Sequence, residues 1–421
     1  METTRPQEFT AIIVGGSVAG LTLAHCFARA NINYVLLEAR ESLAPQLGAG
    51  IVIMPNGCRI LDQIGILDPM RKFMTRMAMQ YRRRSSGEVV GAADWPKLVE
   101  DRLGYPCGIA QRQLLLRSLH DQLEDKSKIV LQKKVVRIQH EPGSVTVKCQ
   151  DGSEVVGHIV VGADGIHSKI RNEMQRIADE EGPSGMMDKD KTRVTAEYNA
   201  IFGISAPIDT LSPGDGHVAS DIDHSGLVFV SNQALPQWFF FSKLDKRYQE
   251  KDIPRFTKEE LEKQVEEFSD FHFTENVTLG DLMKTTTALS YVPLEEASHE
   301  FWTYKRVVCV GDSIHKMTPN MGQGGNQAIE SAATLTNCLL ELLSTSTTSH
   351  PSEADLATTL TKYQDLRKGR AEMFVKLSNL VTRDESLATL RHVLRFLYYP
   401  PLNSKQYAGK RTSVCLKEGI C

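Results

Sequence analysis

One stretch near the front of the chain, residues 11–38, constrains the fold more than any other. An apolar run is followed by a glycine-rich turn, an amphipathic helix, a second apolar run and a terminal acid, Glu38. Strand, turn, helix, strand and acid in this order are typical of a βαβ unit that binds a dinucleotide. An ordinary βαβ unit with a tight turn is the alternative interpretation.

The turn between the first strand and the helix predicts a phosphate site. Gly15 permits the tight turn, and Gly20 lets the helix pack closely on the strand. Free N–H groups at the helix N-terminus attract a pyrophosphate, and Glu38 can accept hydrogen bonds from a ribose. Ser17 stands where the usual pattern has its middle glycine, but a small side chain still lets the phosphates approach the backbone.

Composition restricts the class of protein. The 421 residues exceed the usual size of one hydrophobic core, so we expect two packed domains. The hydrophobic fraction of 41% and the charged fraction of 24% are typical of a globular protein, and the net charge of -3 gives no reason to expect nucleic acid as a partner.

Targeting signals and cysteines suggest the compartment. The first residues contain no apolar signal region, and no apolar run is as long as a membrane span, so we expect a cytoplasmic protein. The eight cysteines, which include Cys415 and Cys421, form no C-x-x-C pair, which predicts buried free thiols and no metal site. Peripheral membrane contact through the apolar segment 394–399 is the alternative to packing on its own domain.

Two further glycine–acid turns each follow an apolar run. They lie at 162–165, which contains Asp164 and Gly165, and at Gly311 and Asp312. Because the carboxyl ends of neighbouring parallel strands converge on one crevice, three such turns can address one long ligand.

With these three motifs in order, residues 9–380 resemble single-component FAD-dependent monooxygenases of the aromatic-hydroxylase class. The resemblance implies an α/β fold with a glutathione-reductase-like, FAD-binding Rossmann domain, an inserted, mostly antiparallel β-sheet substrate domain, and C-terminal helices. We expect the FAD-binding domain at 1–178 and 301–345, the substrate domain at 179–300 and the helical region at 346–421.

The resemblance also implies how FAD is held. The cofactor-binding residues would be Gly15, Ser17 and Gly20 at the pyrophosphate, Glu38 at the adenosine ribose, Asp164 and Gly165 toward FAD and NAD(P)H, Arg112 and Asp312 toward the ribityl chain, and Pro319, Gly322, Gly324, Gly325 and Asn326 along the isoalloxazine. Gly50 and Ile51 would let backbone pass against a flat ligand. NAD(P)H would bind transiently at the domain interface.

A narrower resemblance rests on residues 15–25, 55–57 and 197–204. They are similar to fungal monooxygenases that epoxidise prenyl chains in indole-diterpene, meroterpenoid and alkaloid pathways. This implies that the enzyme epoxidises an alkene of a large apolar secondary metabolite with NAD(P)H and O2, through a flavin hydroperoxide. Some of those proteins carry an apolar C-terminal anchor; no such tail precedes Cys421 in the sequence, so membrane anchoring is not expected. An aromatic hydroxylase and a flavin-fold isoprenoid carrier without turnover remain the alternatives.

The substrate pocket should be apolar, because alkene epoxidation needs no substrate base. On a strand, two of the four aromatic rings at 238–241 would face the flavin and two would face the core. Tyr198 is the candidate catalytic residue, as a hydrogen-bond donor or a substrate-orienting group; a half-buried strand tyrosine is the alternative. We interpret His315 as fixing the turn after Gly311, and His25 and His167 as helix-face residues.

Overall fold

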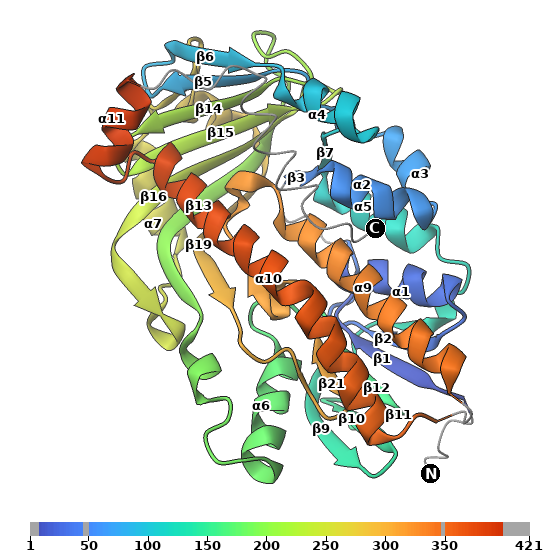
Figure 1. Cartoon of the computed structure of the whole chain (residues 1–421). Helices are drawn as coiled ribbons and strands as arrows, with labels where there is room; N and C mark the ends of the chain where they lie inside the picture. The colour runs from blue at the N-terminus through green and yellow to red at the C-terminus, as the bar shows by residue number, and fades with distance from the viewer. Residues whose placement is uncertain (1–7, 45–49, 347–349, 399–421) are drawn as a thin grey trace.

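The computed structural model describes residues 8–44, 50–346 and 350–398. Cys415, Cys421 and the first residues of the chain lie outside these described ranges. The other six cysteines are free thiols, and all are buried. Two large sheets and a long helix that runs past both of them organise the molecule (Figure 1).

The first sheet has six strands and contains the βαβ unit. Its strands are, in spatial order, β20 (Thr303–Tyr304), β21 (Val307–Cys309), β12 (Ile159–Gly162), β1 (Thr10–Val14), β2 (Asn33–Leu37) and β8 (Ile129–Val130). All neighbours pair in parallel except β20 and β21. Strand β1 lies between β2 and β12 and is buried along its whole length, as its continuous apolar sequence predicts.

The second sheet has eight strands and forms the other half of the molecule. Its strands are β22 (His315–Lys316), β19 (Thr286–Ser298), β13 (Thr195–Ser205), β16 (Pro236–Gln249), β15 (His224–Val230), β14 (Gly216–Asp221), β5 (Gln80–Arg84) and β6 (Val89–Ala93). Only β14 and β5 pair in parallel. The α/β fold with a mostly antiparallel second sheet is therefore confirmed.

Strand pairing does not follow the predicted domain boundaries everywhere. Residues 80–93 fall in the first predicted stretch of the FAD-binding domain, yet their hairpin extends the eight-stranded sheet beside β14. Residues 315–316 likewise pair with the end of β19. The substrate half is thus assembled from three separate parts of the chain.

Strand β19 is absent from the sequence-based expectations. Pro293 and two adjacent acids interrupt its apolar pattern, and a proline cannot donate to a strand ladder. Strand β22 pairs only with Ala297 and Ser298, so among the described residues no strand pairs with that edge of β19 at Pro293. On the other edge, the pairing with β13 shifts register next to Pro293.

Smaller elements complete the two halves. The remaining strands are β3 (Gly50–Ile53), β4 (Thr75–Arg76), β7 (Gly108–Gln111), β9 (Val135–Glu141), β10 (Ser144–Cys149), β11 (Glu154–Gly157), β17 (His272–Thr274) and β18 (Val277–Thr278). The α-helices are α1 (Val18–Arg29), α2 (Pro55–Gln63), α3 (Leu67–Arg71), α4 (Trp95–Leu103), α5 (Arg112–Asp121), α6 (Lys169–Glu181), α7 (Lys258–Glu267), α8 (Leu279–Lys284), α9 (Gly324–Thr345), α10 (Glu353–Glu385) and α11 (Leu390–Tyr398). The short 3-10 helices that border the site are η3 (Glu250–Asp252), η4 (Gly311–Ser313) and η5 (Pro319–Met321).

Helix α10 runs alongside α9 from the six-stranded sheet to the eight-stranded sheet (Figure 1). Its buried residues pack against α9 at one end and reach β19 and β14 at the other. Among the described residues, no helix is both long enough and apolar enough to cross a membrane.

Candidate active site

Two cavities meet between the sheets and form one elongated space. The larger encloses about 710 Å³ and the smaller about 600 Å³. They share five lining residues: Ile51, Arg112, Asp312, Gly324 and Gly325. Residues from all three sequence motifs line this space, so the three glycine–acid turns converge on one crevice as predicted.

The smaller cavity lies at the N-terminus of α1. Its wall contains Gly15, Ser17 and Glu38. Helix α1, which is described in full, has no acidic side chain in its first turn and no side-chain cap, so its first N–H groups and partial positive charge face the cavity. Glu38 accepts hydrogen bonds from the backbone N–H groups of Gly16 (2.7 Å) and Arg40 (2.9 Å), which fixes its carboxylate at the cavity wall.

Asp164 lines the same cavity, but its carboxylate serves the next helix. It accepts hydrogen bonds from the N–H groups of Lys169 (2.7 Å) and Ile170 (3.1 Å) and from the Ser168 hydroxyl (2.5 Å). Burial raises the pKa of Asp164, and these hydrogen bonds partly offset the effect. Gly165, at φ +82°, turns the backbone beside it. The Asp164 carboxylate is therefore occupied within the protein, and the backbone of the turn at 164–165 is the part that can contact a ligand in the cavity.

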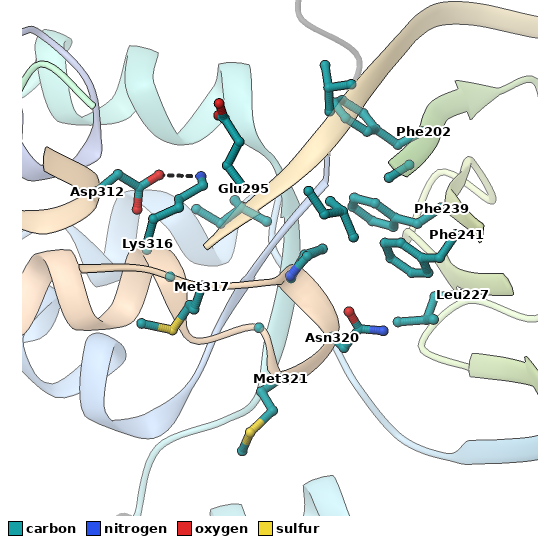
Figure 2. Close-up of a pocket in the computed structure, with 18 of the residues that line it drawn as sticks. Phe202, Leu227, Phe239, Phe241, Glu295, Asp312, Lys316, Met317, Asn320 and Met321 are labelled. Atoms are coloured by element: carbon teal, nitrogen blue, oxygen red, sulfur yellow. Dashed lines mark hydrogen bonds and ion pairs between the residues drawn. The ribbon is translucent and has the colours of Figure 1, made fainter. Parts of the chain in front are cut away.

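Charged groups gather where the two cavities join. Arg112 donates a hydrogen bond from Nη2 to Ser17 Oγ (2.7 Å), and Lys316 Nζ pairs with Asp312 Oδ2 (2.5 Å; Figure 2). Burial alone would raise the pKa of Asp312, but the positive charge and hydrogen bond of Lys316 lower it below its ordinary value. Asp312 is thus held as a carboxylate that can accept hydrogen bonds from hydroxyl groups.

The segment 319–326, here called the flavin loop, crosses from η5 into α9. Gly322 adopts φ +64°, and α9 begins without an acidic residue in its described first turn. Asn326 fixes the loop to β3: its amide nitrogen donates to the carbonyls of Gly322 (2.6 Å) and Val52 (2.9 Å), and its oxygen accepts from Met54 N–H (3.0 Å). A second helix N-terminus therefore points at the same space as α1.

A buried ion cluster, the Glu330 cluster, lies behind the flavin loop. Glu330 on α9 accepts hydrogen bonds from Arg367 (2.6 Å) and Arg370 (2.7 Å) on α10. Asn56 at the start of α2 donates to Glu330 (2.6 Å) and to Gln323 of the loop (3.1 Å). The cluster joins α2, α9 and α10 to the loop and explains the Pro-Asn-Gly segment at 55–57, for which the sequence alone suggested no specific role.

The other side of the larger cavity is aromatic. Three rings line it: Phe202 on β13, and Phe239 and Phe241 on β16 (Figure 2). The ring centroids of Phe202 and Phe239 are 5.7 Å apart, and those of Phe239 and Phe241 are 6.0 Å apart. We call these three residues the aromatic wall. Trp238 and Phe240 point to the opposite face, into the core of the eight-stranded sheet. The alternation predicted for residues 238–241 is confirmed.

Sequence reasoning missed several polar residues of the cavity, and two of them form a pair. Glu295 on β19 lines the larger cavity and pairs with His167 (Oε1 to Nε2 3.3 Å). His167 lies in the turn before α6, so the prediction of a helix-face residue was wrong. Two adjacent acids within an otherwise apolar strand sequence were the available signal for Glu295.

All predicted cofactor-binding residues line one of the two cavities except Gly20 and Asn326, which support the adjoining turns.

Tyr198 is absent from the described lining residues of both cavities. Its buried hydroxyl lies 2.9 Å from Ser386 Oγ, at the end of α10. A catalytic role for Tyr198 stays a prediction, and one that must act through its neighbours. His315 is buried, with Nε2 3.0 Å from Ser331 Oγ, behind the turn that it was predicted to support.

Comparisons with known proteins agree with this arrangement. Residues 8–374 match the family model described as FAD binding domain. The chain is 38% identical over 395 residues to the FAD-dependent monooxygenase ptmM of Penicillium ochrochloron, covering 94% of this chain and 93% of that protein. It is 39% identical over 392 residues to the FAD-dependent monooxygenase verC1 of Penicillium polonicum, covering 93% of this chain but 48% of verC1, so it spans about half of that relative. HpxO of Klebsiella pneumoniae, solved with FAD and uric acid, shares the fold with a TM-score of 0.80 over 98% of both chains at 19% identity.

Proposed function

Because this chain belongs to the family of fungal FAD-dependent monooxygenases, we propose that it epoxidises an alkene on a large apolar secondary metabolite. The alkene would be a prenyl side chain or a similar group, and NAD(P)H and O2 would be the co-substrates. A phenol hydroxylase of the same class is the second candidate within enzymes. A flavin-fold carrier without turnover is disfavoured, because a carrier has no need of a flavin loop.

The aromatic wall is the observation that carries the proposal. Phe202, Phe239 and Phe241 line the larger cavity, and Leu227 and Val292 add aliphatic surface. Such a wall binds a hydrocarbon chain by excluding water, at roughly 25 cal/mol per Å² of apolar area buried. Three of the charged residues that line the cavity, Asp312, Lys316 and Glu295, lie away from this row of rings (Figure 2). Alkene epoxidation needs no substrate base among the rings.

The chain fits FAD along the elongated space. The uncapped N-terminus of α1 would hold the pyrophosphate, Glu38 the adenosine ribose, and Asp312 the ribityl hydroxyls. The backbone of the flavin loop and the N-terminus of α9 would stabilise negative charge on the ring system. When bound and reduced by NAD(P)H, FAD activates O2 for oxygen transfer. The protein orients the alkene, keeps water out and supplies the charges around the ring.

The proposal is tested by incubating the FAD-loaded protein with NADPH, O2 and two matched substrates, a prenylated indole and a phenol of similar size. We expect an oxygenated product only from the alkene, detected by mass spectrometry, and its hydrolysis to a diol under acid. Oxygenation of the phenol alone would contradict epoxidation. Tight FAD retention without NADPH oxidation on either substrate would favour the carrier.

Replacing Asp312 or Arg112 by alanine should weaken FAD binding while the fold is retained. Each variant would lose hydrogen bonds between a charged side chain and FAD, worth about 1.5–3 kcal/mol, which corresponds to roughly ten- to a hundredfold weaker binding. Quenching of flavin fluorescence measures the affinity, and circular dichroism checks the fold. Asp365→Ala, on the exposed side of α10, is the control and should bind FAD as the unmodified protein does. Unchanged affinity in both Asp312→Ala and Arg112→Ala would show that the cofactor lies elsewhere.

A further inference from the structure

Monooxygenation requires a proton at a site that should be dry. Each turnover converts substrate, O2, NAD(P)H and one H⁺ into oxygenated substrate, NAD(P)⁺ and water. The hydride and the proton supply the two hydrogens of the water. Since a bound flavin and substrate would fill the cavity and exclude bulk water, a group that lines it would deliver that proton.

Several titratable residues line the larger cavity, and most are unsuited to transfer a proton. They are Arg112, His167, Glu250, Lys251, Arg255, Glu295, Asp312 and Lys316. Guanidinium groups do not deprotonate in proteins. Lys316 lowers the pKa of Asp312 and keeps it ionised, and Glu250 accepts a hydrogen bond from Val194 N–H (2.9 Å). Lys251 is exposed at the rim.

We propose that Glu295 and His167 form the proton-transfer pair of the flavin cavity, with Glu295 holding the proton inside and His167 exchanging it with solvent. The His167 side chain is 76% exposed, whereas that of Glu295 is 12% exposed. Their 3.3 Å contact joins the outside of the protein to the cavity wall in one step. In Figure 2, Glu295 lies near the Asp312–Lys316 pair, across the cavity from the aromatic wall.

The surroundings of Glu295 favour a carboxyl group that binds a proton reversibly. Burial raises its pKa. His167 before α6, Lys316 on β22 and Arg171 on α6 lower it, whereas Glu250 on η3 raises it further. Because the pKa is raised overall, Glu295 carries its proton to a higher pH than an exposed glutamate, and proton delivery should fail as the pH rises above that value.

Glu296, the residue next to Glu295 on β19, shows that only one of the two adjacent glutamates lines the cavity. Glu296 is also buried, with a raised pKa, but it points to the opposite face of β19 and accepts hydrogen bonds from Asn379 on α10 (3.0 Å). It lies outside the set of described cavity-lining residues. Glu296→Gln is therefore a matched control for Glu295→Gln.

The test uses the holoenzyme without substrate. Dithionite-reduced protein is mixed with O2 in a stopped-flow spectrometer at a series of pH values. Two electrons pass to O2, and the reduced anionic flavin, O2 and one H⁺ become oxidised flavin and H2O2. In the unmodified protein and in Glu296→Gln, reoxidation should slow as the pH rises. In Glu295→Gln it should be slower by roughly a hundredfold or more at low pH, with the pH dependence lost.

Two further measurements separate proton transfer from a structural role. Infrared spectra of the resting protein should contain a protonated carboxylic acid band that titrates with pH and is lost in Glu295→Gln but kept in Glu296→Gln. His167→Ala should slow reoxidation, and added imidazole should restore it. Unchanged reoxidation and pH dependence in Glu295→Gln, with normal FAD content, would overturn the proposal. A failure of epoxidation would leave these results unaffected, because the inference rests on the flavin cavity and no substrate is used.

Discussion

Replacement of Glu330 by alanine is expected to lower the free energy of unfolding by about 3–5 kcal/mol, because it leaves two buried guanidinium groups without their carboxylate. The side chains of Arg367 and Arg370 are 0% and 6% exposed, so water cannot replace the lost partner. Asn56, which also donates to Gln323 of the flavin loop, would lose Glu330 as an acceptor as well. Denaturant unfolding measures the loss, and FAD titration should show weaker binding in the same variant.

An exposed pair on the same helix is the control. Glu341 on α9 pairs with Lys362 on α10, but its side chain is 63% exposed, so Glu341→Ala should cost less than about 1 kcal/mol. Equal losses in the two variants would contradict the special role of the buried cluster.

The stability from Glu330 should also depend on pH. Burial alone would raise its pKa, but Arg367, Arg370 and Asn56 lower it from 4.5 to about 2. A carboxyl whose pKa is depressed by folding stabilises the native state above its unfolded pKa. The difference between the unmodified protein and Glu330→Ala should therefore shrink as the pH falls from about 4.5 to about 2.

Replacement of Gly20 by alanine should damage both the fold and FAD binding. A Cβ at this position would lie 1.9 Å from the carbonyl oxygen of Gly15, whose backbone already adopts φ +108°. Overpacking of this kind costs typically about 1–3 kcal/mol, and here relief requires the phosphate-binding turn to move. We expect a lower melting temperature together with at least tenfold weaker FAD binding.

Gly369 provides the opposite case. It lies within α10, and a Cβ there would meet no described atom within 4 Å. Gly369→Ala should stabilise the protein by about 0.5–1 kcal/mol, since alanine loses less backbone entropy than glycine in a helix. If Gly20→Ala bound FAD as tightly as Gly369→Ala, close packing at the turn would not matter for the cofactor.

The parts of the fold that were predicted depend on short-range patterns. Residues 11–38 contain a complete βαβ unit, so its strands, turn and helix can be read without knowledge of distant partners. The alternation of rings at 238–241 likewise follows from the two-residue period of a strand. The convergence of the three glycine–acid turns could be predicted from one rule, that neighbouring parallel strands have their carboxyl ends at the same edge of a sheet.

The parts that were missed depend on long-range partners. Pro293 made β19 hard to predict, because a proline is accepted in a strand only where no neighbouring strand needs its N–H group. The positions of the neighbouring strands cannot be known from the local sequence. The pairing of β5 with β6 within residues 80–93 is local in the sequence. The pairing of β5 with β14 could not be predicted, because β14 lies more than a hundred residues later in the chain. Glu295 could not be placed in the cavity without β19, and the pairing of His167 with it could not be foreseen either.

The parallel six-stranded sheet also determines when the protein can fold on the ribosome. Ile13 pairs with Val161, and Val161 pairs with Val308, so the central strands come from the beginning, the middle and the last third of the chain. The edge of β12 therefore stays unpaired until about three quarters of the polypeptide has been synthesised. Since late, non-local pairing slows folding and exposes apolar strands, we expect nascent chains to depend on chaperones and to aggregate when translation stalls before residue 307.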